Sequence, residues 1–365
     1  MPRGDLTHRY ARHEGPSPLA PMGSGLASIG LHQWVLDWWA GSGGVVGSLL
    51  RVATLPLELG FRMASGAWGR MYDAGMLPLQ RAPVPVISVG NLTVGGSGKT
   101  PLASWLLKGL QERGEKPALV SRGYGQDEIL LHRRWAPDTL VIAEEDRAFG
   151  AWKAARKGAT VVVLDDGFQH RRLARDLDVV LLASSTPRKV RLLPRGPFRE
   201  PLSSLNRAGV VVVTQKGMAD DTLPLEGRLG PYLREPPVRV AFVPKGWSKL
   251  TGESVDGPEG EYLAVAAIGD PESFSRVLRE ATGREGDLLP YPDHHEYSWA
   301  DVETFMDLAR GRTLVTTEKD AVKLEPYCKQ LKELRVLRLG VEVLAGEEQL
   351  WRHIEGVLRA GKRNQ

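Results

Sequence analysis

The chain has 365 residues, a formal net charge of +4 and a single cysteine, Cys328. Its length suits about two domains of roughly 100–200 residues each. One cysteine excludes a disulfide framework and a cysteine-based zinc site, and it is typical of a reducing cytoplasm. The positive charge favours anionic partners, among which nucleotides, nucleic acids and acidic lipids all stay open.

The N-terminal part divides in two. Residues 1–30 are punctuated by Pro, Gly, Arg and His and lack the apolar core of a signal peptide, so we expect a disordered extension. Residues 31–80 carry Trp34, Trp38, Trp39 and Trp68, and charges interrupt their apolar runs before the ~20 residues that a spanning helix needs. We predict an amphipathic helix pair lying on a membrane surface with its indoles at headgroup level. The alternative is two helices packed on the protein's own sheet.

A glycine-rich turn joins a predicted strand at residues 84–89 to a predicted helix at residues 101–110. Glycines at 95, 96 and 98 let backbone N–H groups converge on an anion at the positive end of the helix. Lys99 is expected to reach the β and γ phosphates and the Thr100 hydroxyl to bind Mg²⁺. Thr93 stands where the usual pattern has its first glycine, and a glycine-rich linker is the alternative. The predicted ATP-binding residues are Thr93, Val94, Gly95, Gly96, Ser97, Gly98, Lys99 and Thr100.

Apolar strands alternate with helical or loop segments from residue 84 onward. Runs without polar alternation suit strands covered on both faces, so we predict an α/β fold with a doubly wound, mostly parallel P-loop sheet. A proline-rich stretch at 223–237 looks like a boundary before a second, smaller α/β domain. The expected strands are 116–123, 139–142, 160–164, 178–182, 209–213, 239–243, 262–268, 312–317 and 335–339, and the later helices are 271–282, 299–310 and 347–360. The expected domains are 81–232, which holds the P-loop, and 233–345, followed by a C-terminal helix and basic tail at 346–365.

A second carboxylate is needed to hold the metal. Residues 161–164 are apolar and end in Asp165 and Asp166, as a Walker B strand does, so Asp165 is the predicted second ligand of Mg²⁺. A helix cap is the alternative role for this aspartate. Residues 167–170 should lie at the same edge of the sheet, where open α/β folds bind ligands.

Basic residues follow this strand. Between Arg171 and Arg207 there are nine Lys or Arg against three acids, and two of the nine, Arg195 and Arg199, lie in the proline-rich stretch 192–202. A loop of guanidinium groups and apolar tips suits a phosphorylated substrate with an apolar part. A solvated basic face is the alternative interpretation.

Seven blocks of sequence together resemble the tetraacyldisaccharide 4'-kinase (lipid A 4'-kinase) family. They are residues 88–101 (SVGNLTVGGSGKTP), 121–125 (SRGYG), 165–170 (DDGFQH), 194–202 (PRGPFREPL), 268–271 (IGDP), 292–295 (PDHH) and 316–324 (TTEKDAVKL). The resemblance implies ATP- and Mg²⁺-dependent phosphorylation of the 4'-hydroxyl of a tetraacylated glucosamine disaccharide 1-phosphate, the lipid A disaccharide 1-phosphate. It also implies a peripheral or monotopic enzyme on the cytoplasmic face of the bacterial inner membrane. Thr93 is usual in this family, but the family's Gly-Asp-Glu-Pro reads Gln126-Asp127-Glu128-Ile129 here.

The resemblance also implies roles for individual residues. Asp127 corresponds to the family's catalytic base, and its histidine partner is His294 or His295, of which we expect His294. Together with Lys99 they form the expected catalytic set. In the sequence Asp127 follows a turn and His294 lies in a turn of the other domain, so we expect them to meet when the domains close on substrate. Substrate binding is expected at Asn91, Gln169, His170, Arg195 and Arg199.

A P-loop GTPase-like switch or maturation factor is the alternative function. Guanine recognition commonly uses Asn-Lys-x-Asp after a late strand, and residues 214–217 (TQKG) lack both the Asn and the Asp. A nucleic-acid partner is not expected, because few aromatic residues stand among the arginines to stack on bases.

Overall fold

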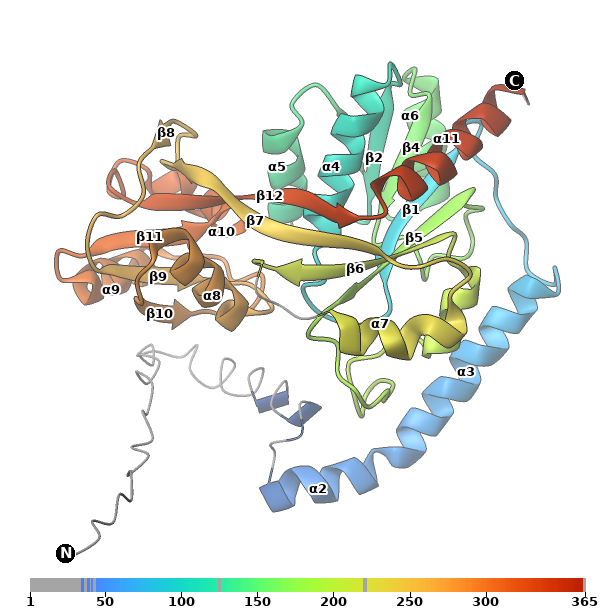
Figure 1. The fold of residues 1–365 in the computed structure, drawn as a ribbon, viewed down its shortest axis with the longest axis horizontal. Helices are drawn as coiled ribbons and strands as arrows, with labels where there is room; N and C mark the ends of the chain where they lie inside the picture. Colours follow the sequence, from blue (N-terminus) through green and yellow to red (C-terminus); the bar gives the residue numbers. More distant parts are fainter. Residues whose placement is uncertain are drawn as a thin grey trace, which may run out of the picture.

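The computed structural model describes residues 34–35, 38–39, 41, 44–123, 126–218 and 222–363. The extension expected at residues 1–30 lies outside them. Figure 1 shows one sheet that runs through both halves of the molecule, with helices packed on its faces. The α/β class and the mostly parallel sheet are confirmed.

The sheet has twelve strands in the order β10-β9-β11-β12-β7-β6-β5-β1-β4-β2-β3, with β8 paired to β7. Every pair is parallel except β7 with β12 and β7 with β8. The strands are β1 (Val86–Asn91), β2 (Pro117–Ser121), β3 (Leu140–Ala143), β4 (Val161–Asp165), β5 (Leu177–Ala183), β6 (Val210–Lys216), β7 (Val238–Ser248), β8 (Ser254–Val255), β9 (Tyr262–Ala266), β10 (Asp287–Pro290), β11 (Thr313–Thr317) and β12 (Arg335–Ala345).

The P-loop half is built around β1, which lies between β4 and β5. All six residues of β1 and all five of β4 are buried, as expected for apolar strands covered on both faces. The helices of this half are α4 (Lys99–Glu112), α5 (Gln126–Trp135), α6 (Arg147–Arg156) and α7 (Leu223–Leu229), with the 3₁₀ helices Leu202–Arg207 and Gly230–Tyr232.

The smaller half is tied to the P-loop half by two long strands. β7 pairs in parallel with β6 through Val238–Phe242 and then continues, antiparallel to β12, into the smaller half (Figure 1). The start of β12 pairs with β11. The remaining elements there are α8 (Pro271–Thr282), α9 (Trp299–Ala309), α10 (Glu318–Leu324) and the 3₁₀ helix Glu325–Tyr327. Because the sheet is continuous, the residue at which one domain gives way to the next stays a prediction.

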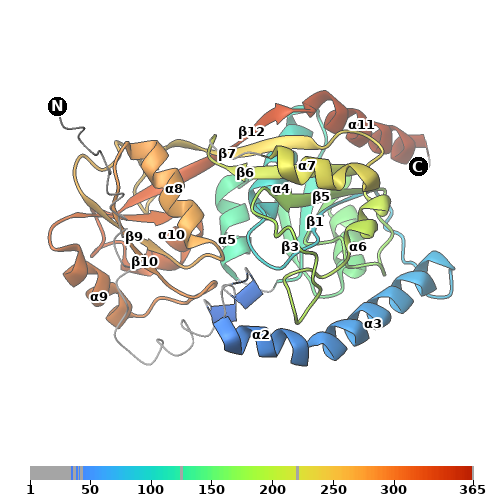
Figure 2. The same ribbon diagram turned by 60° about the horizontal axis from the view of Figure 1, so that its bottom comes forward.

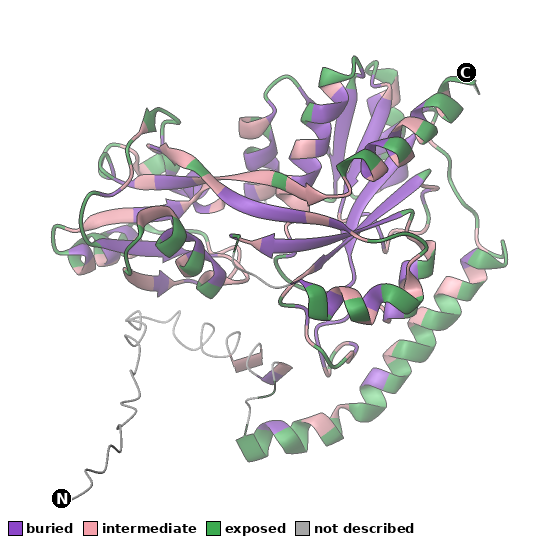
Figure 3. Ribbon diagram, viewed as in Figure 1, coloured by how far each residue is buried: buried purple, intermediate pink, exposed green. Residues whose placement is uncertain are grey.

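Helices α2 (Gly44–Ala53) and α3 (Leu55–Asp73) extend away from the sheet (Figure 2). Their only buried residues are Gly47, Glu58 and Tyr72, so the alternative in which they pack on the sheet is wrong. Both helices are coloured mostly as exposed in Figure 3. Their exposed apolar side chains are Val45, Val46, Leu49, Leu50, Val52, Leu55, Leu57, Leu59, Met63 and Trp68.

The tryptophans at the N-terminal side do not all reach outward, contrary to expectation. Trp38 is 6 % exposed, and its Nε1 donates a hydrogen bond to the Gly47 carbonyl oxygen at 2.8 Å. Trp39 Nε1 donates to the Pro194 carbonyl oxygen at 3.0 Å. Among the described residues no single helix has the length and apolarity to span a membrane, and α2 with α3, bent by 46°, meets that criterion only as a pair.

The C-terminal helix α11 (Glu347–Arg363) packs across the P-loop half through Leu350, Trp351, Ile354 and Leu358. Trp351 lies against Trp105 of α4, with ring centroids 5.4 Å apart, and Arg113 Cζ stacks 3.5 Å from its ring centroid. A Cβ atom at Gly109 would lie 2.4 Å from the Trp351 ring, so only glycine allows this close approach.

Gly109→Ala should therefore lower the free energy of unfolding by about 1–3 kcal/mol through overpacking, although Ala is the better helix former. The matched control is Gly356→Ala on α11, where a Cβ meets nothing within 4 Å. That change should be neutral or stabilising by up to about 1 kcal/mol. Urea unfolding of both variants is the measurement, and equal stability of the two would contradict this packing of α11 on α4.

Candidate active site

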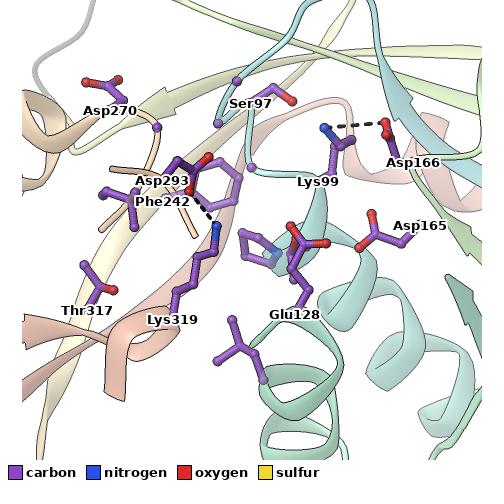
Figure 4. A pocket seen from close by; sticks show the side chains of 18 of the residues that line it. Ser97, Lys99, Glu128, Asp165, Asp166, Phe242, Asp270, Asp293, Thr317 and Lys319 are labelled. Atoms are coloured by element: carbon purple, nitrogen blue, oxygen red, sulfur yellow. Dashed lines mark hydrogen bonds and ion pairs between the residues drawn. The ribbon is translucent and has the colours of Figure 1, made fainter. Parts of the chain in front are cut away.

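A pocket of about 770 Å³ lies at the carboxyl ends of β1 and β4, where open α/β sheets bind ligands. One wall is the turn 94–100 with α5, and the opposite wall is formed by residues 268–270, Asp293, His294 and the start of α10. Figure 4 shows polar side chains from both walls pointing into it. The pocket is therefore shared between the two halves of the molecule.

The glycine-rich turn joins β1 to α4 as the sequence predicts, and buried side chains hold it. Gly98 is the N-cap of α4 and has φ 82°, a backbone conformation that favours glycine. A Cβ at this position would also lie 2.1 Å from the Phe242 ring, so both the backbone conformation and the packing require glycine. Asn91 Nδ2 donates to Ser97 Oγ at 2.9 Å, and Thr214 Oγ1 donates to the Ser97 carbonyl oxygen at 3.0 Å. The backbone is thus fixed with its N–H groups at the N-terminus of α4.

Lys99 reaches across this N-terminus to Asp166. Its Nζ lies 3.5 Å from Asp166 Oδ1, and Arg199 Nη1 lies 2.9 Å from Asp166 Oδ2. Burial would raise the pKa of Asp166, but the charges of Lys99 and Arg199 lower it below its usual value. Lys99 and Arg199 are therefore already paired with an anion in the pocket.

Asp165, the last residue of β4, is 4 % exposed. Its Oδ2 lies 3.2 Å from His132 Nε2, whereas its Oδ1 is buried without a hydrogen-bond partner. Glu128 points toward Asp165 in Figure 4. Burial and the Asp165 charge raise the pKa of Glu128 to about 7. A partnerless buried oxygen beside a second carboxylate is a donor set that fits Mg²⁺.

The described residues hold no group of three His, Cys, Asp or Glu side chains able to bind a metal unaided. Mg²⁺ does not require such a group, because it usually takes one or two carboxylates plus substrate phosphates and water. Sequence reasoning missed Glu128 and His132. Their spacing of four residues on what proved to be a helix places them on one face, but no helix was expected there.

Asp127 and His294 are in contact in this structure. His294 Nδ1 lies 3.0 Å from Asp127 Oδ2 and 3.2 Å from Oδ1. Asp127 lies in the first turn of α5 rather than in a loop and is 2 % exposed. Its Oδ2 also lies 3.7 Å from Lys319 Nζ and 3.9 Å from Lys323 Nζ. Burial alone would raise the pKa of Asp127, but the His294 hydrogen bond and the two lysines lower it to about 2.

His294 faces the pocket, whereas His295 faces away. His295 Nε2 lies 3.1 Å from Asp301 Oδ2, and its ring packs 4.8 Å from that of Tyr291. The two neighbours diverge because His294 adopts the left-handed conformation with φ 62°. On the pocket side His294 Nε2 lies 3.3 Å from Lys319 Nζ. Since an ammonium group only donates, Nε2 accepts and Nδ1–H donates to Asp127.

The residues expected to bind substrate fall into two groups. Gln169, His170 and Arg199 line the pocket, and Arg199 Nη1 lies 3.3 Å from Gln169 Oε1. Burial and neighbouring arginines lower the pKa of His170 to about 4. Asn91 is fully buried behind Ser97, and Arg195 lies outside the pocket wall, with its Nη1 2.8 Å from Glu58 Oε2.

The other end of the pocket is apolar, and sequence reasoning missed it because its residues come from four separate segments. Lys216 Nζ and Asp270 Oδ2 form an ion pair of 3.0 Å beside it. The apolar lining residues are Phe242, Ile268, Phe274, Val277, Leu337 and Leu339.

Comparison with known proteins identifies the family of the chain. A family model described as "Tetraacyldisaccharide-1-P 4'-kinase" matches residues 50–359. A tetraacyldisaccharide 4'-kinase from an Anaeromyxobacter species is 36 % identical over 360 residues, which cover 89 % of this chain and 96 % of the relative. A relative of the same name from Chlorobaculum parvum is 34 % identical, with 79 % and 90 % covered. The solved structure of "apo" form LpxK from Aquifex aeolicus in complex with ATP superimposes with a TM-score of 0.70 at 32 % identity, covering 85 % of this chain and 99 % of that one.

The pairing of His294 with Asp127 can be tested by titration. The hydrogen bond to Asp127 raises the pKa of His294 above 6.5 against the opposing effect of burial. The stabilisation that protonated His294 contributes is therefore fully present below about pH 6.5 and is lost as the pH rises through the folded-state value. In Asp127→Asn the pKa of His294 should fall, as read from the NMR shifts of its ring C–H groups. The His295 signals serve as the internal control, and an unchanged His294 pKa would contradict the pairing.

Proposed function

This chain belongs to the tetraacyldisaccharide-1-P 4'-kinase family, and from that premise we propose how its residues phosphorylate the 4'-hydroxyl of a tetraacylated glucosamine disaccharide 1-phosphate. The protein is a phosphotransferase of lipid A biosynthesis with an alcohol acceptor. A P-loop GTPase-like switch is not favoured. Gly217 stands at the position where guanine recognition would require an Asp.

One observation carries the proposal: a single pocket has the P-loop on one wall and, on the opposite wall, His294, which is hydrogen-bonded to Asp127. The phosphates of ATP would lie on the backbone N–H groups of residues 93–100, with Lys99 exchanging Asp166 for phosphate oxygens. The adenine would lie against the apolar residues around Phe242 and Phe274, because a flat aromatic ligand gains most from apolar walls with few polar groups.

We assign the Mg²⁺ site to the Thr100 hydroxyl and Asp165 Oδ1, with Glu128 on its other side. When bound, the ion would offset the negative charge of the phosphate groups during transfer. The contribution of this chain is to present a buried, unpartnered carboxylate oxygen beside the Lys99 ammonium group.

The acceptor hydroxyl is oriented by His294 in this proposal. His294 lines the pocket, whereas Asp127 lies behind it and stays ionised at neutral pH. Asp127 would hold the ring with Nδ1–H toward itself, leaving Nε2 to accept the hydroxyl proton once Lys319 gives up its contact. The largely dissociative transfer needs the hydroxyl in line with the γ phosphate more than it needs early deprotonation.

The acyl chains call for an apolar surface next to the site. We propose that α2 and α3 lie on the cytoplasmic face of the inner membrane and that the protein is peripheral or monotopic there. In support, these helices expose an apolar surface and contact Arg195 in the loop that leads to Arg199. Gln169, His170 and Arg199 would bind the sugar phosphate.

The test of function is a kinase assay with purified protein, radiolabelled ATP and the tetraacylated disaccharide 1-phosphate. Label should enter the lipid. Asp127→Ala and His294→Ala should each lower kcat by about 10²–10⁴-fold with little change in the KM for ATP, because each removes general-base help. The double variant should be far less than multiplicatively worse, since the two residues act as one unit.

His295→Ala is the matched control, because His295 contacts Asp301 rather than the pocket, and it should stay close to wild type. Absence of label in the lipid would refute the proposed function. If the wild-type protein labels the lipid but the kcat losses of the two single variants multiply in the double variant, only the proposed pairing of Asp127 with His294 is refuted.

Membrane association predicts a role for exposed side chains rather than for Trp38. Val46 and Leu49 on α2 are 62 % and 67 % exposed. Changing both to Ser should weaken partition into phosphatidylglycerol-containing vesicles by at least about tenfold, because each side chain loses 1.5–3 kcal/mol of burial in the lipid. Met306→Ser on α9, also an exposed apolar residue, is the control. Unchanged partition of the double variant in a vesicle sedimentation assay would rule out α2 as the membrane contact.

A further inference from the structure

We propose that His132 is a positioning residue that fixes the Asp165 carboxylate for metal binding. The inference rests on the proposed function, in which Asp165 is a ligand of Mg²⁺. It adds a buried link, Ser104–His132–Asp165, from the P-loop helix α4 through α5 to the end of β4.

The contacts of His132 account for both of its ring nitrogens. Its side chain is 0 % exposed. Nδ1 lies 2.8 Å from Ser104 Oγ, and Nε2 lies 3.2 Å from Asp165 Oδ2. An ionised carboxylate only accepts, so Nε2 of the neutral ring carries the proton and Nδ1 accepts the Ser104 hydroxyl proton. The Asp165 carboxylate therefore fixes the tautomer of His132, and the Ser104 hydroxyl, which can donate or accept, supports that tautomer by donating to Nδ1.

The remaining oxygen of Asp165 makes this bond important for its orientation. Among the described residues, His132 is the side chain that hydrogen-bonds the Asp165 carboxylate, and Oδ1 has no partner. Without the bond the carboxylate is free to rotate about its last side-chain torsion, which is broad for Asp. With it, Oδ2 is held and Oδ1 stays directed to where the cation would bind. Such outer partners typically change metal affinity by about 10–100-fold when they are removed.

Helix α5 extends the effect to the rest of the site. Asp127 and Glu128 lie in its first turn, and Glu128 and His132 are four residues apart on one face. At the other end Trp135 Nε1 donates to Glu318 Oε1 of α10 at 2.7 Å. One rigid helix thus carries the general-base partner, the second carboxylate of the metal site and the residue that orients the first.

Core packing alone is the competing explanation, and two substitutions at one position separate it from the proposal. Gln places its side-chain amide near the Nε2 position and can still donate to Asp165. Asn places its amide near the Nδ1 position, so it keeps the Ser104 contact but does not reach Asp165. Both are smaller than His and polar, so a packing role predicts similar effects for the two.

The measurement is Mn²⁺ affinity by electron paramagnetic resonance, on the full chain with a non-hydrolysable ATP analogue. We expect His132→Asn to weaken Mn²⁺ binding by about 10–100-fold and His132→Gln to recover most of the wild-type affinity. Analogue binding without metal, measured by calorimetry, should be unchanged, because the P-loop is intact. Ser104→Ala should weaken Mn²⁺ binding in the same direction, since it leaves Nδ1 without its donor. Ile129→Ala, a buried change on the same helix, controls for loosened packing.

Equal Mn²⁺ affinity of His132→Asn and His132→Gln would overturn the proposal, as would a loss in Ile129→Ala as large as that in His132→Asn. Asp165→Asn separates this failure from that of the proposed function. If Asp165→Asn weakens Mn²⁺ binding while the His132 variants do not, only the positioning role falls. If Asp165→Asn also binds Mn²⁺ normally, the metal site itself is wrongly assigned.

Discussion

The carboxylate of Asp127 is only 2 % exposed, so it needs positively charged or hydrogen-bonding partners within the protein. Its imidazole and ammonium partners all come from the smaller half of the molecule. His294, Lys319 and Lys323 approach it from residues 292–324, while Asp127 itself lies in the first turn of α5 of the P-loop half. Removing one partner of such a buried pair typically costs about 3–5 kcal/mol, because the remaining charge has no water to replace it. The contacts that dock the smaller half on α5 are therefore the same contacts that assemble the proposed catalytic pair. The paired strands β7 and β12 run through both halves and hold them in this relative position.

The same pairing applies to four of the cations that face the pocket. Lys99 and Arg199 share Asp166, Lys216 pairs with Asp270, and Lys319 pairs with Asp293. Each is held by a carboxylate at a distance where a phosphate oxygen can take its place. When phosphate binds, charge-assisted hydrogen bonds to phosphate oxygens replace those to the carboxylates. These side chains are already ordered, so phosphate binding costs little additional side-chain entropy. The pocket is in this sense preorganised, which is the condition under which electrostatic stabilisation of phosphoryl transfer is most effective.

The sequence predicted those elements whose structure depends on residues close together in the chain. The apolar runs predicted β1, β4, β5 and β6, and the glycine-rich turn predicted the N-terminus of α4. The helices predicted at 271–282 and 299–310 correspond to α8 and α9, which are capped by the side chains of Asp270 and Ser298. What could not be predicted depends on contacts distant in sequence. The sequence of α5 was not interpreted as a helix, so Glu128 and His132 were not expected to lie on one face. The composition of residues 31–80 predicted that Trp38 contacts the membrane, but its Nε1 donates a hydrogen bond to the Gly47 carbonyl oxygen. The family resemblance favoured His294 over His295, but the left-handed backbone conformation of His294 that accompanies the divergence of the two rings could not be read from the sequence.

Glu58 connects the apolar helices to the site, and its position is unusual for a helix that is otherwise exposed. It is 4 % exposed, accepts a hydrogen bond from the Leu192 N–H at 2.9 Å and pairs with Arg195 at 2.8 Å. The loop that it holds touches the P-loop directly, because the Val94 N–H donates to the Pro197 carbonyl oxygen at 2.8 Å. Two residues further on, Arg199 reaches the pocket. A buried charge on an exposed helix is costly unless it is fully paired, so this contact fixes α3 against the loop rather than leaving it free. A lipid surface bound by α2 and α3 would then stand at a fixed distance from the phosphates, and an acceptor anchored by its acyl chains would present its sugar to the pocket without leaving that surface.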